Sequence, residues 1–153
     1  MASRRIGKSR AAEPLPDIRV SARARAPLSG AGVRRLAGAV LKAEGAKLNA
    51  LSITFVGPAR MRTLNREHLG HDRPTDVLAF GMTLVGDVYV CPAVAVRDAK
   101  HFGSTPKDEV RRLVIHGILH VLGYDHPDGN HRTASAMWQV QERHLARFGR
   151  LAP

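Results

Sequence analysis

Hydrophobic residues alternate with polar ones in some stretches of the chain and recur every three or four residues in others. Residues 51–56 (LSITFV) alternate and are rich in β-branched side chains, which is typical of a half-buried strand. Residues 77–80 and 84–90 are further apolar runs that predict strands, and residues 17–21 could add a short edge strand. The pattern therefore predicts a small sheet of about four strands.

Helical spacing predicts about five helices. They are expected over residues 28–44, 59–67, 92–102, 105–122 and 133–148. The fourth begins with a threonine cap, Thr105, followed by Pro106 at the first helical position and an acidic residue, Asp108, three positions after the cap. Gly123 is typical of the residue that ends such a helix. Together the elements predict an α+β fold, a small four-stranded sheet with helices packed against it.

Chain length and composition favour one globular domain. The chain has 153 residues, of which 44% are hydrophobic. Residues 1–15 are predicted to be a flexible basic N-terminal extension, and residues 16–153 a single domain. An organellar transit peptide is the alternative for the Arg- and Ser-rich start, but Glu13, Asp17 and the strand-like residues that follow favour a solvated tail.

The charge balance points to a polyanionic partner. Lys and Arg number 24 against 13 Asp and Glu, a formal net charge of +11, which favours nucleic acid or an anionic membrane surface. Aromatic residues make up only 5%, which disfavours an extended base-stacking platform. No run approaches the ~20 apolar residues of a membrane helix. The single cysteine, Cys91, excludes an intramolecular disulfide and favours a reducing compartment, the cytoplasm, with Cys91 as a packed residue.

Three histidines lie within VIHGILHVLGYDH, residues 114–126. His116 and His120 are four residues apart and therefore share one helix face. Gly123 lets the chain reverse, so that His126 can approach the same point. The helix is apolar almost all round, and unpaired histidines inside it would be costly without a ligand. Three imidazoles suit Zn²⁺ or a neighbouring first-row ion, and three protein ligands leave a fourth position open, as in catalytic sites.

The residue after His116 is Gly117, where metalloproteases with a related spacing carry a glutamate that acts as the base. Its absence disfavours a metalloprotease. Zinc brings the pKa of a bound water near neutrality, so phosphodiester hydrolysis does not require that glutamate. Gly117 is expected to allow the close approach of either the substrate or a neighbouring strand to the metal.

Three other residues are candidates for catalysis. Asp125 precedes His126 and could orient a ligand or transfer a proton, or it could simply form a turn. His71 and Arg73 belong to the polar turn HLGHDRPTD, which is expected to line a cleft. Four arginines are expected near that cleft: Arg60, Arg62, Arg66 and Arg73. Three histidines are expected to be ordinary exposed residues: His101, His131 and His144.

The segment HGILHVLGYDH resembles the H-G-x-L-H-x-x-G-Y-D-H signature of the bacterial YbeY-type endoribonucleases, the rRNA maturation factors. HDRPTDVLAF, VGDVYVCP and MWQVQERHLARFG are similar to further segments of that family in the same order, so the resemblance covers about residues 50–149. It implies a mixed sheet and one zinc ion per chain, held by His116, His120 and His126. It also implies cleavage of single-stranded RNA in 3′-end maturation of small-subunit rRNA and in ribosome quality control. The partners would be ribosomal RNA and components of the small ribosomal subunit, with no membrane involved.

One position departs from the family pattern. Many members carry an arginine, thought to contribute to RNA cleavage, in a Y-R-x-x-D-x-P-T segment, and here Leu69 stands at that position. Arg66, His71 or Arg73 could supply the missing cation. A zinc-stabilised ribosome assembly factor without catalysis is therefore a second hypothesis, and the oligomeric state stays open.

Overall fold

The computed structural model describes residues 14–127 and 133–153. Four strands form one sheet in the order β1-β2-β4-β3: β1 (Asp17–Ala22), β2 (Ala50–Phe55), β4 (Val85–Val90) and β3 (Val77–Met82). β1, β2 and β4 run parallel, and β3 pairs with β4 in the antiparallel direction. The sheet is therefore mixed, as the resemblance implied.

Among the described residues, five α-helices accompany the sheet: α1 (Gly30–Ala43), α2 (Pro58–Leu69), α3 (Pro92–Phe102), α4 (Pro106–Val121) and α5 (Ala136–Phe148). The predicted cap of α4 is confirmed, because Thr105 Oγ1 accepts a hydrogen bond of 3.1 Å from the Asp108 backbone N–H. α5 begins later than the predicted residue 133, since Ser135 is its cap and accepts from the Trp138 N–H at 3.1 Å. The helix count and the α+β class are confirmed.

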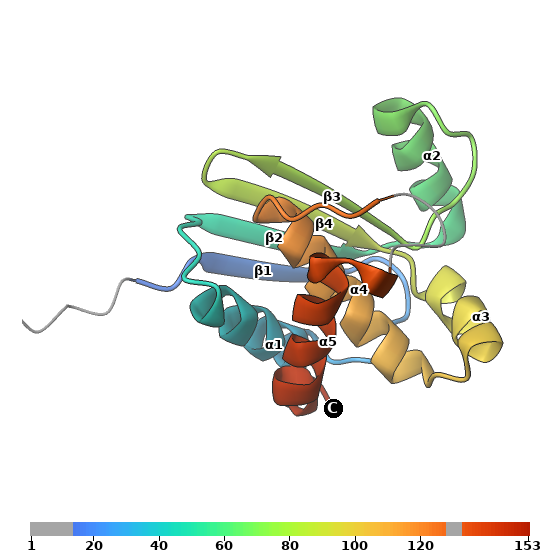
Figure 1. Ribbon diagram of the computed structural model, residues 1–153. Coiled ribbons are helices and arrows are strands. Elements are labelled where there is room, and N and C mark those ends of the chain that lie inside the picture. Colours follow the sequence, from blue (N-terminus) through green and yellow to red (C-terminus); the bar gives the residue numbers. More distant parts are fainter. Residues whose placement is uncertain (1–13, 128–132) are drawn as a thin grey trace, which may run out of the picture.

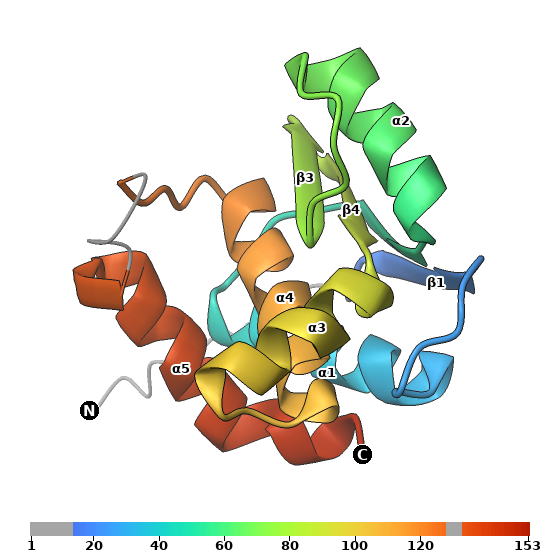
Figure 2. The same ribbon diagram turned by 90° about the vertical axis from the view of Figure 1, so that its right-hand side faces the viewer.

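α1 and α4 pack against one face of the sheet, and α5 packs against these two helices. All three lie beneath the sheet in Figure 1, while α2 stands beyond the end of β3 and β4. α3 lies alongside α4 when the molecule is viewed from its other side (Figure 2). The main core lies between the sheet and the helices α1 and α4, and α5 adds Met137 to it. A smaller cluster under α2 includes Met61, Leu64 and the buried Cys91, which is packed as expected.

α4 is the central helix and is buried along most of its length, as predicted. Its buried residues are Val110, Leu113, Val114, Ile115, Gly117, Ile118 and Leu119. A Cβ added at Gly117 would lie 2.5 Å from Val88 Cγ1 on β4, a distance that real Cβ atoms essentially never show. Gly117 therefore allows the neighbouring strand to approach, which decides between the two expectations for this glycine. His116 and His120 then lie beside β3, an edge strand of the sheet.

The N-terminal part of the chain is described only from Pro14. Residues 1–13 of the expected extension, and the residue His131, lie outside the described residues. Pro14 and Leu15, which precede β1, are exposed. None of the helices in residues 14–127 and 133–153 is long and apolar enough to cross a membrane.

Candidate metal centre

The structure brings the three predicted histidines together. α4 carries His116 and His120 on one face, and the chain then reverses at Gly123, whose φ of +95° strongly favours glycine. The reversal returns His126, so that one ligand atom of each histidine lies within 4.8 Å of the others. His116 Nε2 and His120 Nε2 are 3.0 Å apart. Two nitrogens bound to one tetrahedral zinc lie about 3.3 Å apart, so the three side chains could hold a metal ion with small adjustments.

Hydrogen bonds turn two of these imidazoles toward the common point. His116 Nδ1 lies 2.8 Å from Gln141 Oε1, and the Gln141 amide donates from Nε2 to Glu142 Oε1 at 3.2 Å. Because a carboxylate only accepts here, Oε1 of Gln141 must face His116, whose Nδ1 then donates. His126 Nδ1 lies 3.1 Å from the Pro127 carbonyl, which also only accepts. In both rings Nε2 keeps the lone pair that a metal needs.

Glu142 is itself held by an arginine. Arg112 donates from Nε to Glu142 Oε1 at 2.8 Å and from Nη2 to Oε2 at 3.3 Å. The Nη1 group of Arg112 donates to Ser104 Oγ at 2.9 Å and to Glu109 Oε2 at 3.1 Å. A continuous series of hydrogen bonds thus runs from Arg112 through Glu142 and Gln141 to His116.

Gln141 contacts the site, although the sequence did not predict this. It was expected only to face the body of the protein, and its exposed fraction is 2%. The available signal was polarity, since a glutamine on the buried face of a helix needs a hydrogen-bond partner there. The sequence could not name that partner, because His116 lies 25 residues earlier on another helix.

We expect Gln141→Leu to weaken zinc binding about 10- to 100-fold, the usual cost of removing an outer hydrogen-bond partner of a metal-bound histidine. Leucine fills a similar volume but leaves His116 Nδ1 without its acceptor. Competition for zinc against a chromophoric chelator measures the change. The control is Gln139→Leu, an exposed position on the same helix. Wild-type zinc affinity in a folded Gln141→Leu variant would contradict the assigned role.

A second network fixes the loop that carries His126. The Tyr124 hydroxyl donates to Glu44 Oε2 at 2.6 Å, and His144 Nε2 lies 2.5 Å from Glu44 Oε1. Burial raises the pKa of Glu44, but hydrogen bonds from Tyr124 and His144 outweigh it and leave that pKa below its usual value. The hydrogen bond to the Glu44 carboxylate also raises the pKa of the Tyr124 hydroxyl. The end of α1 and α5 therefore hold the loop two residues before His126.

His144 corrects an expectation. The prediction that His144 is exposed is wrong, because its exposed fraction is 6%. Its partner Glu44 lies 100 residues away along the chain, so only the packing of α1 against α5 brings the two together. His101 is exposed, as expected.

The environment of His120 favours the neutral ring. Burial lowers the pKa of His120, and the neighbouring His126 lowers it further by charge repulsion. The Tyr124 backbone and Asp125 act in the opposite direction but do not reverse the shift. Neutral imidazole is the form that binds metal ions, so burial prepares His120 for that role near neutral pH.

The histidines line an open cavity of about 470 Å³. Its other walls are Leu69, Asp76, Asp125 and residues 77–80 of β3. Asp125 Oδ1 accepts a hydrogen bond of 2.8 Å from the His126 backbone N–H, and the residue lines the cavity, so its place fits the expectation that it could orient a ligand. Leu69 lies on the wall with an exposed fraction of 53%, which places an apolar side chain where many YbeY-type proteins have an arginine.

None of the four arginines expected near the cleft lines the histidine cavity itself. Arg62 makes two hydrogen bonds of 2.8 Å to Asp72, and Arg66 reaches the same carboxylate at 3.4 Å. The hydrogen bonds from Arg62 hold the pKa of Asp72 below its usual value. Arg73 forms no ion pair with any residue in 14–127 or 133–153, and it lines a groove that adjoins the histidine cavity. His71 is exposed, and its catalytic role stays a prediction.

Comparison with protein families shows which family the chain belongs to. Residues 24–149 match the family model described as Endoribonuclease YbeY. The chain belongs to the YbeY family. An Endoribonuclease YbeY of Sulfurihydrogenibium sp. is 41% identical over 101 residues, which cover 61% of this chain. The match spans 66% of that relative, slightly less than two thirds of its length. The Endoribonuclease YbeY of Frankia casuarinae is 33% identical over 158 residues, which cover 92% of this chain and 72% of that relative.

A solved structure has a similar fold. The solution structure of TM1509 from Thermotoga maritima superposes with a TM-score of 0.63 and 29% identity, covering 86% of this chain and 88% of that chain. The resemblance found in the histidine segment is confirmed at the level of the YbeY family by the family model.

Proposed function

We propose that the chain is a zinc-dependent endoribonuclease that cuts single-stranded RNA. His116, His120 and His126 would hold one Zn²⁺ per chain. The observation that supports this most is that three imidazoles converge on the wall of an open cavity, which leaves a side of the metal accessible to substrate. Membership of the YbeY family and the net charge of +11 support RNA as the substrate.

The same family membership supports a place in ribosomal RNA processing. We propose that the substrates are precursors of small-subunit rRNA at their 3′ end, and that the protein also serves ribosome quality control in the cytoplasm. Its partners would then be ribosomal RNA and components of the small ribosomal subunit.

Each residue around the metal would have a defined task. Bound zinc would supply Lewis acidity toward a phosphoryl oxygen and a nucleophile at neutral pH. Asp125 faces the cavity, and no described residue donates to its Oδ2, so this oxygen is available to accept a proton. Arg73 would bind the RNA backbone beside the cavity, in place of the arginine that Leu69 replaces. His71 is a further candidate, two residues before Arg73.

A second function is favoured by Leu69. An exposed leucine on the cavity wall is consistent with a zinc-stabilised ribosome assembly factor that no longer cuts RNA. A metalloprotease is disfavoured, because position 117 faces β4 and has no room for the glutamate that would act as its base.

The test is a cleavage assay with purified protein on matched single-stranded and double-stranded RNAs. We expect the single strand to be cut, EDTA to stop the reaction, and added zinc to restore it. The rate at limiting RNA should fall steeply between 50 and 200 mM salt, since binding releases counterions.

Two outcomes would contradict the proposed enzyme. One is undiminished cleavage by protein shown to be free of metal. The other is zinc-loaded protein that cuts no RNA yet restores ribosome maturation in depleted cells, which would establish the assembly factor. An unstructured protein substrate serves as the control for proteolysis and should remain intact.

A further inference from the structure

A groove continues from the histidine cavity along α4. A small cavity of about 60 Å³ shares Asp76, Val77 and His116 with the histidine cavity. It shares Asp76, Glu109 and Leu113 with a larger open groove of about 570 Å³. Glu109 lies seven residues before His116, about 10 Å along the helix axis. The groove is therefore within reach of the nucleotides next to a phosphate at the metal centre.

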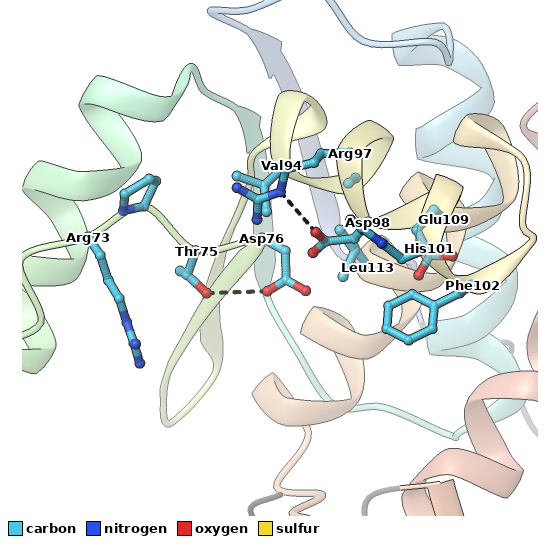
Figure 3. A pocket seen from close by; sticks show the side chains of 12 residues that line it. Arg73, Thr75, Asp76, Val94, Arg97, Asp98, His101, Phe102, Glu109 and Leu113 are labelled. Carbon is cyan, nitrogen blue, oxygen red and sulfur yellow. Dashed lines mark hydrogen bonds and ion pairs between the residues drawn. The ribbon is translucent and has the colours of Figure 1, made fainter. Parts of the chain in front are cut away.

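Phe102 stands at the far end of this groove. It is the last residue of α3, and its exposed fraction is 73%. Figure 3 shows the ring at one end of the groove and Arg73 at the other, with Asp76 between them. The ring pairs with no other aromatic ring among the described residues, and its high exposure leaves ring surface available for stacking. Because the exposed ring lines the groove, it offers a surface on which a base could stack.

The groove also presents two free hydrogen-bond acceptors. Asp98 Oδ1 accepts from Arg97 at 3.1 Å and Glu109 Oε2 accepts from Arg112 at 3.1 Å. Asp98 Oδ2 and Glu109 Oε1 accept nothing from the part of the chain that the structure describes. Carboxylates repel a phosphate but accept hydrogen bonds from the amino groups of nucleobases. Arg73 and Arg97 are exposed on the rim, where a phosphate would lie.

We propose that this groove binds a nucleobase of the RNA strand beside the nucleotide that is cut. The base stacks on Phe102, and its amino edge faces Asp98 and Glu109 while the backbone follows Arg73 and Arg97. This proposal rests on the proposed endoribonuclease function. A basic peptide is the other ligand that carboxylates and an exposed ring could accept. RNA is favoured because the groove is continuous with the histidine cavity and because the net charge of +11 repels a cationic partner.

The test compares Phe102→Ala with the zinc-loaded wild type. Loss of one base–aromatic stack should raise KM for single-stranded RNA about 5- to 150-fold with little change in kcat, because the contact lies away from the reacting phosphate. Phe102→Trp should keep the wild-type KM, since it retains a stacking surface. The control is Met82→Ala, which removes an apolar side chain of 79% exposure at the end of β3. The melting temperature should stay unchanged in each variant.

A base preference gives a second measurement. Uracil lacks the exocyclic amino group that cytosine presents, so wild-type KM should be lower for oligocytidine than for oligouridine. Asp98→Asn should narrow this difference. Equal KM values for the two oligonucleotides in the wild type would overturn the assignment of the carboxylates.

Fluorescence anisotropy with labelled single-stranded RNA separates the possible failures. If the wild type cuts RNA and Phe102→Ala has the same KM, the base subsite is wrong while the enzyme stands. If the wild type cuts nothing but Phe102→Ala still binds RNA more weakly, the subsite stands and the proposed reaction fails. If a lysine-rich peptide loses affinity in Phe102→Ala and RNA does not, the groove is a protein-docking site and the proposal is overturned.

Discussion

His120→Ala is expected to abolish both zinc binding and RNA cleavage in a protein that remains folded. The remaining imidazoles, His116 and His126, are too few to hold the ion as a catalytic site does. The zinc affinity should fall by more than about 100-fold. That is the largest loss usual when only a hydrogen-bond partner of a metal ligand is removed, and His120 is itself an expected ligand. His120 is partly exposed at the cavity, so alanine leaves no closed void in the core. Metal analysis by mass spectrometry and the cleavage rate are measured on the same sample.

His71→Ala provides the comparison for this variant. It removes an exposed histidine that is not part of the metal cluster, so one zinc per chain should remain bound. Its cleavage rate then measures whether His71 contributes to catalysis. Full zinc occupancy in His120→Ala would show that the three histidines are not the ligand set.

Gly117→Glu is expected to unfold the protein rather than create a protease. The position faces β4, and a Cβ there would already lie 2.5 Å from Val88 Cγ1. A buried carboxylate without a partner costs several kcal/mol more, against a total stability of about 5–15 kcal/mol for a typical domain. The milder Gly117→Ala should still lower the free energy of unfolding by about 1–3 kcal/mol. Urea denaturation followed by circular dichroism measures both.

Gly38→Ala is the matched control, because it also places a methyl group on a helical glycine. There the new Cβ would lie 3.7 Å from Ile18 Cδ1, an ordinary contact. Alanine should raise stability by up to about 1 kcal/mol through helix propensity. Adding Val88→Ala to Gly117→Ala should recover part of the loss, as contacting residues couple in a double-mutant cycle. A Gly117→Ala protein as stable as the wild type would contradict the close packing of α4 on β4.

Local sequence was sufficient to predict the helices and strands and the cluster of three histidines. Periodicity and the Thr105 cap predicted α4, because helical spacing and capping depend only on near neighbours in the chain. The same short range explains why the histidines could be predicted: His116 and His120 are one turn apart, and Gly123 reverses the chain before His126. The specific order of these residues also predicts the YbeY family, to which the chain belongs.

The tertiary structure decided what depends on contacts between distant segments. The partner of His116 is Gln141 on α5, and the partner of His144 is Glu44 at the end of α1. It also decided that Gly117 accommodates Val88 rather than substrate, and that Arg62 and Arg66 bind Asp72 while Arg73 lines a groove. The physical reason is the same in each case. A side chain's type limits what it can bind, but only the packing of helices and strands determines which partner lies within reach.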